Sequence, residues 1–500
     1  MEEMSISEIQ SKMQSGELTA CRLADLYLER IETFDCGGPK VNSIIELNPE
    51  AQNIAAGLDA ERRAGRLRGP LHGVPVLLKD NIDTADRMQT TAGSLALEGN
   101  YAAADAGLVE RLRRAGALIL GKTNLSEWAN FRGKHSTSGW SSRGGLTRNP
   151  YALDRSACGS SSGSAAAVAA NLTAVAVGTE TDGSIICPAQ TNGIVGIKPT
   201  LGLVSRSGII PIAHSQDTAG PMARTVADAA ILLGVMAGPD PRDRATKSSA
   251  KRGMDDYTPF LDPKGLRGTR LGAARTLFGT DKRVLAIMDS SLDAMKKAGA
   301  VLIDVELKSS DAFGKSELEV LLFEFRSDLN VYLRGCPNAS VHSMEDVIRF
   351  NEENRARVLQ FFGQERMEAA VKKGALRSPK YLKALEKNRR LARAEGIDAL
   401  MKKHRLNAIV LPSGGPAWMI DLVNGDGGRN WDMDSTSYAA VAGYPHITVP
   451  AGSIFGLPVG VSFFARAWQE PELIRLAYAF EQLTRARRVP LFLPSARLGD

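Results

Sequence analysis

Short apolar runs that alternate with helical patterns are the feature that most constrains the fold of this chain. Each run is rich in Val, Ile and Leu, is too short for a helix, and is bounded by glycine, proline or polar residues. Such runs between helices are typical of an α/β fold with a buried, largely parallel or mixed sheet. The runs are GVPVLLKD (73–80), GALILGKT (116–123), LTAVAVGTE (172–180), GIVGIKPT (193–200), NAIVLPS (407–413), YPHITVPAG (444–452) and GLPVGVSFF (456–464).

Residues 311–403 differ from this pattern and predict a helical insertion or cap over the sheet. They are rich in Lys, Arg and Glu, and their apolar residues fall on helical faces. Two further helices are expected near the start, one capped by Ser7 and ending at Gly16, and one capped by Thr19. Because no repeat, low-complexity tract or linker interrupts the chain, we expect a single domain over 1–500.

Charge and hydropathy exclude several classes of protein. The 62 basic and 56 acidic residues give a net charge of +6, and no long block of like charge predicts a nucleic-acid partner. No run approaches the ~18 apolar residues of a membrane span. The first residues, MEEMSISEIQ, lack the layout of a signal peptide. We therefore expect a cytoplasmic monomer, with a trimmed leader as the open alternative.

The five cysteines are few, odd in number and without a CxxC pair. This pattern predicts neither a disulfide framework nor a zinc site, and it suits reduced thiols in the cytosol. Cys158 and Cys187 are expected to serve as small packing residues. No cofactor and no metal are predicted.

The segment GALILGKT (116–123) matches the phosphate-loop pattern letter by letter. That pattern binds phosphate only where its residues form a loop whose N–H groups converge on the anion. Here the intervening residues are Ala-Leu-Ile-Leu, which predict a buried strand, and the preceding residues predict a helix. A nucleotide site is therefore not expected, and Lys122 is predicted at a strand end.

Three polar positions beside apolar segments could carry chemistry. Lys79 ends a buried strand, where burial can lower the pKa of a lysine enough for it to act as a base; alternatively it pairs with Asp80 or Asp83. SACGSSSGS (156–164) enters an alanine-rich helix, whose N-terminus favours negative charge; simple capping is the alternative. Ser184 lies in GTETDGSIICPA (178–189), and no histidine is near it in the sequence.

Taken together, these segments resemble the amidase signature family. The family pattern runs roughly GGSSGGS, then GTDTGGSIR.PA, then G..G.KPT. The corresponding segments here are CGSSSGS (158–164), GTETDGSIICPA (178–189) and GIVGIKPT (193–200). The likeness also covers GPLHGVPVLLKDN (69–81) and SQDTAGPMARTVAD (215–228). It implies a mixed sheet flanked by helices on both faces.

The resemblance also implies a Ser–Ser–Lys triad. By motif position, Ser184 is the nucleophile, Ser160 is the bridging serine with a cis peptide bond, and Lys79 is the base. The resemblance places the oxyanion hole and substrate contacts in the turn formed by Thr181, Asp182, Gly183 and Ser184. The expected reaction is hydrolysis of a carboxamide through an acyl-enzyme, with release of ammonia.

Departures from the family pattern concern the substrate. Cys158, Ser162 and Asp182 replace usual glycines, and Ile186 replaces a common arginine. This combination is similar to the peptide amidase branch, which removes the C-terminal amide of peptides. The alternatives are an amidase-like subunit of a tRNA-dependent amidotransferase and a non-enzymatic phosphate or nucleotide binder. His135 and Trp140 could line the cleft or belong to an ordinary loop.

Overall fold

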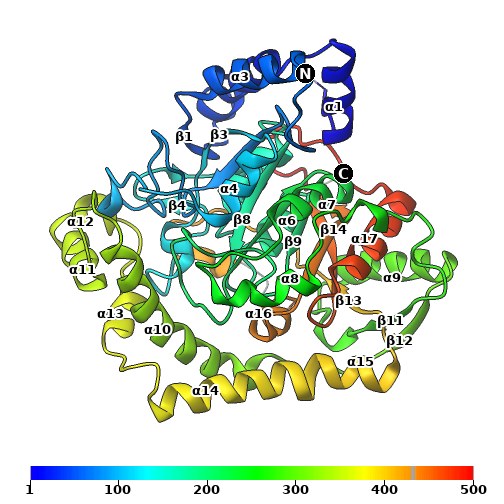
Figure 1. Ribbon diagram of the computed structural model, residues 1–500. Helices are drawn as coiled ribbons and strands as arrows, with labels where there is room; N and C mark the ends of the chain where they lie inside the picture. Colours follow the sequence, from blue (N-terminus) through cyan, green and yellow to red (C-terminus); the bar gives the residue numbers. More distant parts are fainter. Residues whose placement is uncertain (1, 429–432, 434, 499–500) are drawn as a thin grey trace.

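A large mixed sheet forms the centre of the molecule in the computed structural model, which describes residues 2–428, 433 and 435–498 (Figure 1). The sheet has 11 strands in the order β1-β3-β2-β8-β10-β9-β14-β15-β13-β11-β12. Their bounds are β1 Ile44–Leu47, β2 Pro75–Lys79, β3 Leu118–Thr123, β8 Val175–Glu180, β9 Val195–Lys198, β10 Thr218–Ala223, β11 Arg270–Ala273, β12 Val301–Asp304, β13 Ala408–Pro412, β14 His446–Ile454 and β15 Leu457–Phe464. Two small hairpins lie outside it: β4 Trp140–Ser141 with β5 Gly145–Leu146, and β6 Arg148–Asn149 with β7 Ala152–Ser156.

Strands β2, β3 and β8 are buried along their whole length, which explains why their sequences read as continuous apolar runs. They pair in parallel, β2 with β3 and β2 with β8. Parallel strands end at the same edge of a sheet. Lys79 at the end of β2 and the turn that follows β8 are therefore neighbours.

Two groups of helices flank the sheet, as the sequence predicts. One group is α5 with α6, which pack on each other and on central strands; the other includes α7, which contacts β8, β9 and β10 and packs against α4 and α17. The helices outside the segment 311–404 are α1 Ile6–Ser15, α2 Ala20–Arg30, α3 Ala51–Arg63, α4 Gly107–Arg114, α5 Ser162–Ala169, α6 Ile186–Thr191, α7 Val226–Met236, α8 Ser249–Arg252, α9 Lys282–Lys297, α16 Ser437–Ala442 and α17 Glu470–Thr484. No helix among the described residues is long and apolar enough to cross a membrane.

Residues 311–404 are mainly helical and run along the left and lower sides of the view in Figure 1. Their helices are α10 Asp311–Arg334, α11 Met344–Glu353, α12 Arg355–Val358, α13 Glu365–Val371, α14 Pro379–Arg389 and α15 Asp398–His404. Apolar residues of α10, α11 and α13 pack in one cluster with Trp128 and Phe131. This packing holds α10 beside the loops that follow β3.

The N-terminal helices agree with the sequence except at one cap. Gly16 ends α1 at a φ of +79°, and Thr19 caps α2 by accepting from Arg22 N at 3.1 Å. The cap of α1 is Ser5 and not Ser7. Ser5 forms a capping box with Glu8, whose carboxylate accepts from Ser5 N at 2.7 Å.

GALILGKT forms strand β3 and not a phosphate loop. Gly116 connects the end of α4 to this strand, and Lys122 lies buried near its end. The Lys122 ammonium donates to the carbonyl of Ile82 at 2.7 Å and to Thr90 Oγ1 at 2.9 Å. The lysine therefore anchors the loop after β2, and the predicted strand is confirmed.

Candidate active site

Lys79 lies completely buried at the end of β2, with an exposed fraction of 0%. Its Nζ is 2.8 Å from Ser160 Oγ and 2.8 Å from Thr179 Oγ1, and 3.2 Å from the Thr179 carbonyl. Burial lowers the pKa of Lys79 to about 7, although the carboxylates of Asp217 and Glu180 act in the opposite direction. A large fraction of this amine is therefore neutral at neutral pH and can accept a proton.

The alternative in which Lys79 pairs with Asp80 or Asp83 is wrong. The Asp80 carboxylate accepts from Thr91 and Gly93, and Asp83 accepts from the Tyr332 hydroxyl at 2.8 Å. Both carboxylates are thus engaged in holding the loop after β2, and among the described residues neither forms an ion pair with Lys79.

Ser160 lies in the turn just before α5. The Gly159–Ser160 peptide bond is cis, as the resemblance implied. The serines that follow do not cap α5 with their side chains: Ser161 Oγ donates to the Thr179 carbonyl at 3.0 Å, and Ser162 Oγ donates to the Cys158 carbonyl. Simple capping is therefore not the role of these serines. Ser161 fixes the turn against strand β8, and Ser162 closes a hydrogen bond within the turn.

Ser184 lies in the turn between β8 and α6, with an exposed fraction of 8%. Gly183 has a φ of +77°, a conformation that other residues adopt only with strain. The buried carboxylate of Glu180 accepts from Ile185 N at 2.7 Å and from Ile186 N at 3.0 Å, which fixes the chain just after Ser184. Burial raises the pKa of Glu180.

The backbone joins the two serine segments. Ser161 N donates to the Ser184 carbonyl at 3.2 Å. Within the described part of the chain, no hydrogen bond joins the Ser160 and Ser184 hydroxyls, and the N–H groups of Gly183 and Ser184 donate to no acceptor. The structure thus pairs Lys79 with Ser160 directly and leaves two N–H groups beside Ser184 available to a ligand.

The loop formed by residues 212–217 holds the turn before Ser184 through hydrogen bonds. Thr181 Oγ1 donates to Asp217 at 2.6 Å, and Gln216 Nε2 donates to the Thr181 carbonyl at 3.3 Å. Asp217 also accepts from the backbone N–H groups of Ile212 and Ala213, at 2.8 Å each. Burial raises the pKa of Asp217 to about 6. Thr181 is therefore held by two side chains that sequence reasoning did not single out.

Ser184 opens into a cleft of about 740 Å³. Thr181, Asp182 and Gly183 line it, as does His135, whereas Trp140 is buried against Phe361 and Phe362. The cleft has two walls from different stretches of the chain. The wall that contains Ser184 comes from residues within 129–187, and the other includes residues within 310–321 and 424–427 together with Met433, Thr436 and Ser437.

A smaller cavity of about 370 Å³ also borders the Thr179–Thr181 segment and shares Ala129, Thr181 and Ile212 with the cleft. Asn81, Thr179 and Asp217 line it together with an apolar stretch, Ile209–Ile212. Asn81 Nδ2 donates to Thr179 Oγ1 at 3.0 Å, which is also an acceptor for Lys79. The lysine is therefore surrounded by polar groups from β2, β8 and the turn before α5.

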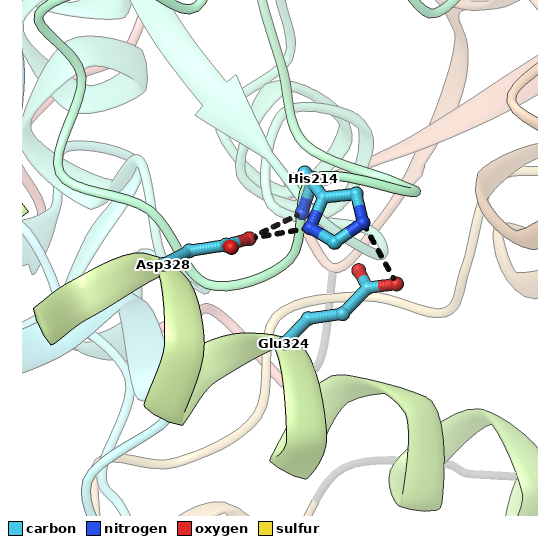
Figure 2. A group of neighbouring side chains, drawn as sticks. All are labelled: His214, Glu324 and Asp328. Atoms are coloured by element: carbon cyan, nitrogen blue, oxygen red, sulfur yellow. Dashed lines mark hydrogen bonds and ion pairs between the residues drawn. The ribbon is translucent and has the colours of Figure 1, made fainter. Parts of the chain in front are cut away.

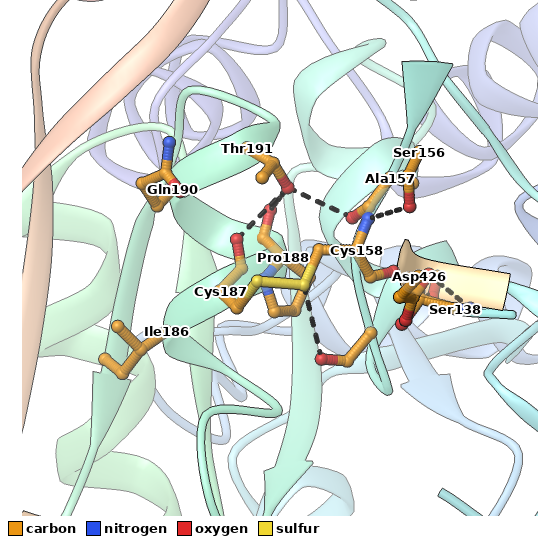
Figure 3. The surroundings of a disulfide bond; sticks show 12 residues. Ser138, Ser156, Ala157, Cys158, Ile186, Cys187, Pro188, Gln190, Thr191 and Asp426 are labelled. Atoms are coloured by element: carbon orange, nitrogen blue, oxygen red, sulfur yellow. Dashed lines mark hydrogen bonds between the residues drawn. A yellow bond between two sulfur atoms is a disulfide. The ribbon is translucent and has the colours of Figure 1, made fainter. Parts of the chain in front are cut away.

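Cys158 and Cys187 form a disulfide, contrary to the expectation of reduced thiols (Figure 3). Cys158 belongs to the turn before Ser160, and Cys187 belongs to the first turn of α6 and lines the cleft. The same two segments are joined by Thr191 Oγ1 and Asn192 Nδ2, which donate to the Ala157 carbonyl at 3.1 and 2.9 Å. Folding brings together two cysteines that are 29 residues apart, which composition and spacing could not indicate.

Among the residues that the structure describes, one group of side chains could offer metal ligands: His214, Glu324 and Asp328 (Figure 2). The imidazole Nδ1 faces Asp328 at 2.7 Å, and Nε2 faces Glu324 at 3.4 Å. Each of the three residues offers one potential ligand atom, and these atoms lie within 4.8 Å of one another, although each ring nitrogen of His214 already faces a carboxylate. The hydrogen bonds favour a protonated imidazole, and the partner carboxylates raise the pKa of His214 although burial opposes them.

The most informative residues that sequence reasoning missed are Thr179, Glu180, Gln216 and Asp217. Thr179 and Glu180 lie within the quoted GTETDGS segment, and Gln216 and Asp217 lie within SQDTAGP. Their presence in motifs was visible, but their contacts with Lys79, Ile185 and Thr181 depend on strand pairing that the chain order does not reveal.

Comparison with known proteins finds relatives that match almost the whole chain. The Amidase family profile matches residues 22–474. An Arabidopsis thaliana protein named as a probable amidase is 40% identical over 504 aligned positions, covering 99% of this chain and 92% of the relative. A glutamyl-tRNA(Gln) amidotransferase subunit of Halorhodospira halophila is 35% identical, with 97% of this chain and 98% of the relative covered.

Solved structures give a stronger likeness. Native peptide amidase from Stenotrophomonas maltophilia is 52% identical with a TM-score of 0.93, and 98% of each chain is covered. A peptide amidase in complex with the competitive inhibitor chymostatin is 53% identical with a TM-score of 0.95, covering 98% of this chain and 99% of that one.

Proposed function

The chain belongs to the amidase family and is a hydrolase that acts on amide C–N bonds, and on that premise we propose that it removes the C-terminal amide of peptides and releases ammonia. The reaction proceeds through a Ser–Ser–Lys triad formed by Ser184, Ser160 and Lys79. The observation that carries this proposal is the 2.8 Å contact between the buried Lys79 amine and Ser160 Oγ.

Each proton has a donor and an acceptor in this scheme. The neutral Lys79 amine accepts the proton of Ser160 as Ser160 accepts the proton of Ser184, and the Ser184 oxygen attacks the amide carbonyl. The N–H groups of Gly183 and Ser184 stabilise the oxyanion. The relay then returns a proton to the nitrogen, ammonia leaves, and water hydrolyses the acyl-enzyme to the free acid.

Thr181 and Asp182 support this step from the same turn. Thr181 is fixed by Asp217 and Gln216, so it holds the turn at the position where the oxyanion forms. Asp182 lines the cleft, where its carboxylate can accept from the leaving ammonia or from a substrate N–H. We propose that chain 1–500 forms one amidase domain and that 311–403 is its helical cap.

The alternative role, as part of a tRNA-dependent amidotransferase, receives less support. The glutamyl-tRNA(Gln) amidotransferase subunit of Thermotoga maritima is 26% identical with a TM-score of 0.72, well below the values for the peptide amidases. The phosphate-binder alternative loses its basis because GALILGKT is a strand. A monomer without nucleic-acid or membrane partners stays a prediction. So does a cytoplasmic location, although the disulfide argues against the premise of reduced cysteines.

Ammonia release from an amidated dipeptide, without ATP or a partner protein, tests the proposed function. The parent chain is expected to release one ammonia per peptide, with the peptide acid as the second product. Ser184→Ala should abolish release while the circular dichroism spectrum stays unchanged. If the parent releases no ammonia from any peptide amide, the proposal is wrong, and an amidotransferase role needs testing with partner subunits.

A further inference from the structure

One face of helix α10 forms a wall of the catalytic cleft. The cleft-lining residues of this helix follow a spacing of i, i+3, i+6, i+7 and i+10, so they share one side of it. They are Asp311, Gly314, Glu317, Leu318 and Leu321. The wall is thus a continuous helical surface that begins in the first turn of α10.

Gly314 leaves free space in this wall. Glycine is the poorest helix former after proline, so a glycine inside a helix calls for a reason. A Cβ built at Gly314 meets no atom within 4 Å, and its φ is not in the left-handed region. Neither packing nor backbone conformation therefore requires glycine here. What the missing side chain provides is room in the cleft.

Leu318 presents an apolar surface to the same cleft. Its exposed fraction is 37%, and it belongs to none of the hydrophobic clusters formed by the described residues. Leu321, one turn further along, is 8% exposed and also lines the cleft. Uncovered apolar surface inside a concave site is typical of a contact for an apolar group of a ligand.

Hydrogen bonds fix this wall relative to the catalytic turn. Gln216 Nε2 donates to Glu317 Oε1 at 3.0 Å as well as to the Thr181 carbonyl. Further along α10, Asp328 and Glu324 bind His214 and Ser215 of the same loop (Figure 2). These hydrogen bonds therefore fix the position of the α10 face relative to the turn that carries Ser184. A fixed spacing of this kind allows the site to select substrates by length.

We propose that Gly314, Leu318 and Leu321 determine specificity by receiving the peptide portion of the substrate. The peptide chain passes Gly314, and an apolar side chain packs on Leu318 and Leu321. The substrate class is accordingly the amides of short apolar peptides, in preference to single amino-acid amides. This inference rests on the proposed function, and a cleft of about 740 Å³ is of a size that holds such ligands.

Gly314→Leu tests the proposal, with Lys315→Leu as the matched control because Lys315 is exposed on the same turn and does not line the cleft. The substrates are an amino-acid amide, a dipeptide amide and a tripeptide amide that share the amide-bearing residue. Gly314→Leu is expected to lower kcat/KM for the tripeptide amide at least tenfold relative to the shortest amide hydrolysed, mainly through KM. Lys315→Leu should leave that ratio within twofold.

Leu318→Asp provides a second measurement. This variant should lower kcat/KM for apolar tripeptide amides at least tenfold. It should change kcat/KM for a lysine-containing tripeptide amide by less than threefold. A parallel loss on all amides, or an unchanged ratio in both cleft variants, overturns the proposal while the parent remains an amidase. Absence of ammonia from every amide with the parent overturns the proposed function as well.

Discussion

Cys158 and Cys187 join, by one covalent bond, the turn that precedes Ser160 and the helix that follows Ser184. The bond lies two residues before Ser160, the proposed bridging serine, and three residues after Ser184, the proposed nucleophile. The relative position of the two hydroxyl groups is therefore restrained from both sides, by this disulfide and by the Ser161–Ser184 backbone hydrogen bond.

Removing the disulfide with Cys158→Ser and Cys187→Ser should destabilise the protein. A cross-link over 29 residues restricts the unfolded chain and contributes about 3–4 kcal/mol by loop entropy. We expect a lower midpoint of thermal unfolding for the double variant, and a parent midpoint that falls when a dithiol reductant is added. Cys336→Ser, which removes a buried free thiol, should respond to reductant as the parent does. Equal midpoints with and without reductant in the parent would contradict the expectation.

Activity should increase as Lys79 loses its proton. Only the neutral amine accepts a proton, and its fraction rises as pH increases through the pKa of about 7. We expect kcat/KM for a peptide amide to rise with pH, to reach half its maximum near that value, and then to level. Asp217→Asn removes a carboxylate that raises the pKa of Lys79, so the rise should move to lower pH. A profile that is flat from acid to alkaline pH argues against lysine as the base.

Lys79→Ala should lower kcat by about 10³-fold or more, because the proposed relay loses its base. Lys122→Met is the matched control: Lys122 is also a buried lysine near a strand end, but its hydrogen bonds go to the loop after β2. This control should lose stability and keep activity per folded molecule within tenfold. Comparable activity losses in both variants would remove the special role of Lys79.

Ser160 and Ser162 allow a comparison within one turn. Ser160→Ala breaks the contact with Lys79, and kcat should fall by about 10²–10⁴-fold, as is typical for loss of proton transfer. Ser162→Ala removes only a hydrogen bond to the Cys158 carbonyl, and kcat should stay within tenfold of the parent. Steady-state ammonia release measures both. A Ser160→Ala variant as active as Ser162→Ala would exclude Ser160 from the relay.

Gly183→Ala should impair catalysis more than folding. Gly183 and Gly456 share a φ of +77°, so alanine at either position costs about 1–2 kcal/mol of unfolding free energy. Gly456 lies in the hairpin between β14 and β15, where an added Cβ meets no atom within 4 Å. A Cβ at Gly183 would lie 3.1 Å from Thr436 Oγ1, so we expect Gly183→Ala to lose at least as much stability as Gly456→Ala, and we expect at least a tenfold loss of kcat in Gly183→Ala alone. Equal activities would place the oxyanion site elsewhere.

The strands that the sequence predicts best are those buried on both faces. β2, β3 and β8 read as continuous apolar runs because no residue in them faces solvent. Strand β10 escaped prediction because TAGPMA contains small residues and a proline and has no clear periodicity. Its place between β8 and β9 also could not be inferred. Strand β10 follows both of these strands in the chain, so the order in the sheet differs from the order in the sequence.

The candidate site was also predictable from the sequence only in part. Lys79 and Ser160 meet, as the motif resemblance implied, because β2 and β8 are parallel neighbours and Ser161 holds the turn before α5 against β8. The disulfide and the support of Thr181 by Asp217 depend on contacts between segments whose spacing carries no distance information. The cap of α1 differs for a local reason, because Glu8 favours Ser5 over Ser7 through the capping box.

The two walls of the cleft have a consequence for how such a protein can diversify. The three proposed reacting groups all fall within residues 79–184, whereas the face of α10 that opposes them begins more than a hundred residues later. Substitutions at positions of that stretch that face the cleft without binding the 212–217 loop, such as Gly314 and Leu318, can accumulate without disturbing the atoms proposed to move protons. New preferences can then be selected on an unchanged reaction, which makes this region the natural target for laboratory evolution of selectivity.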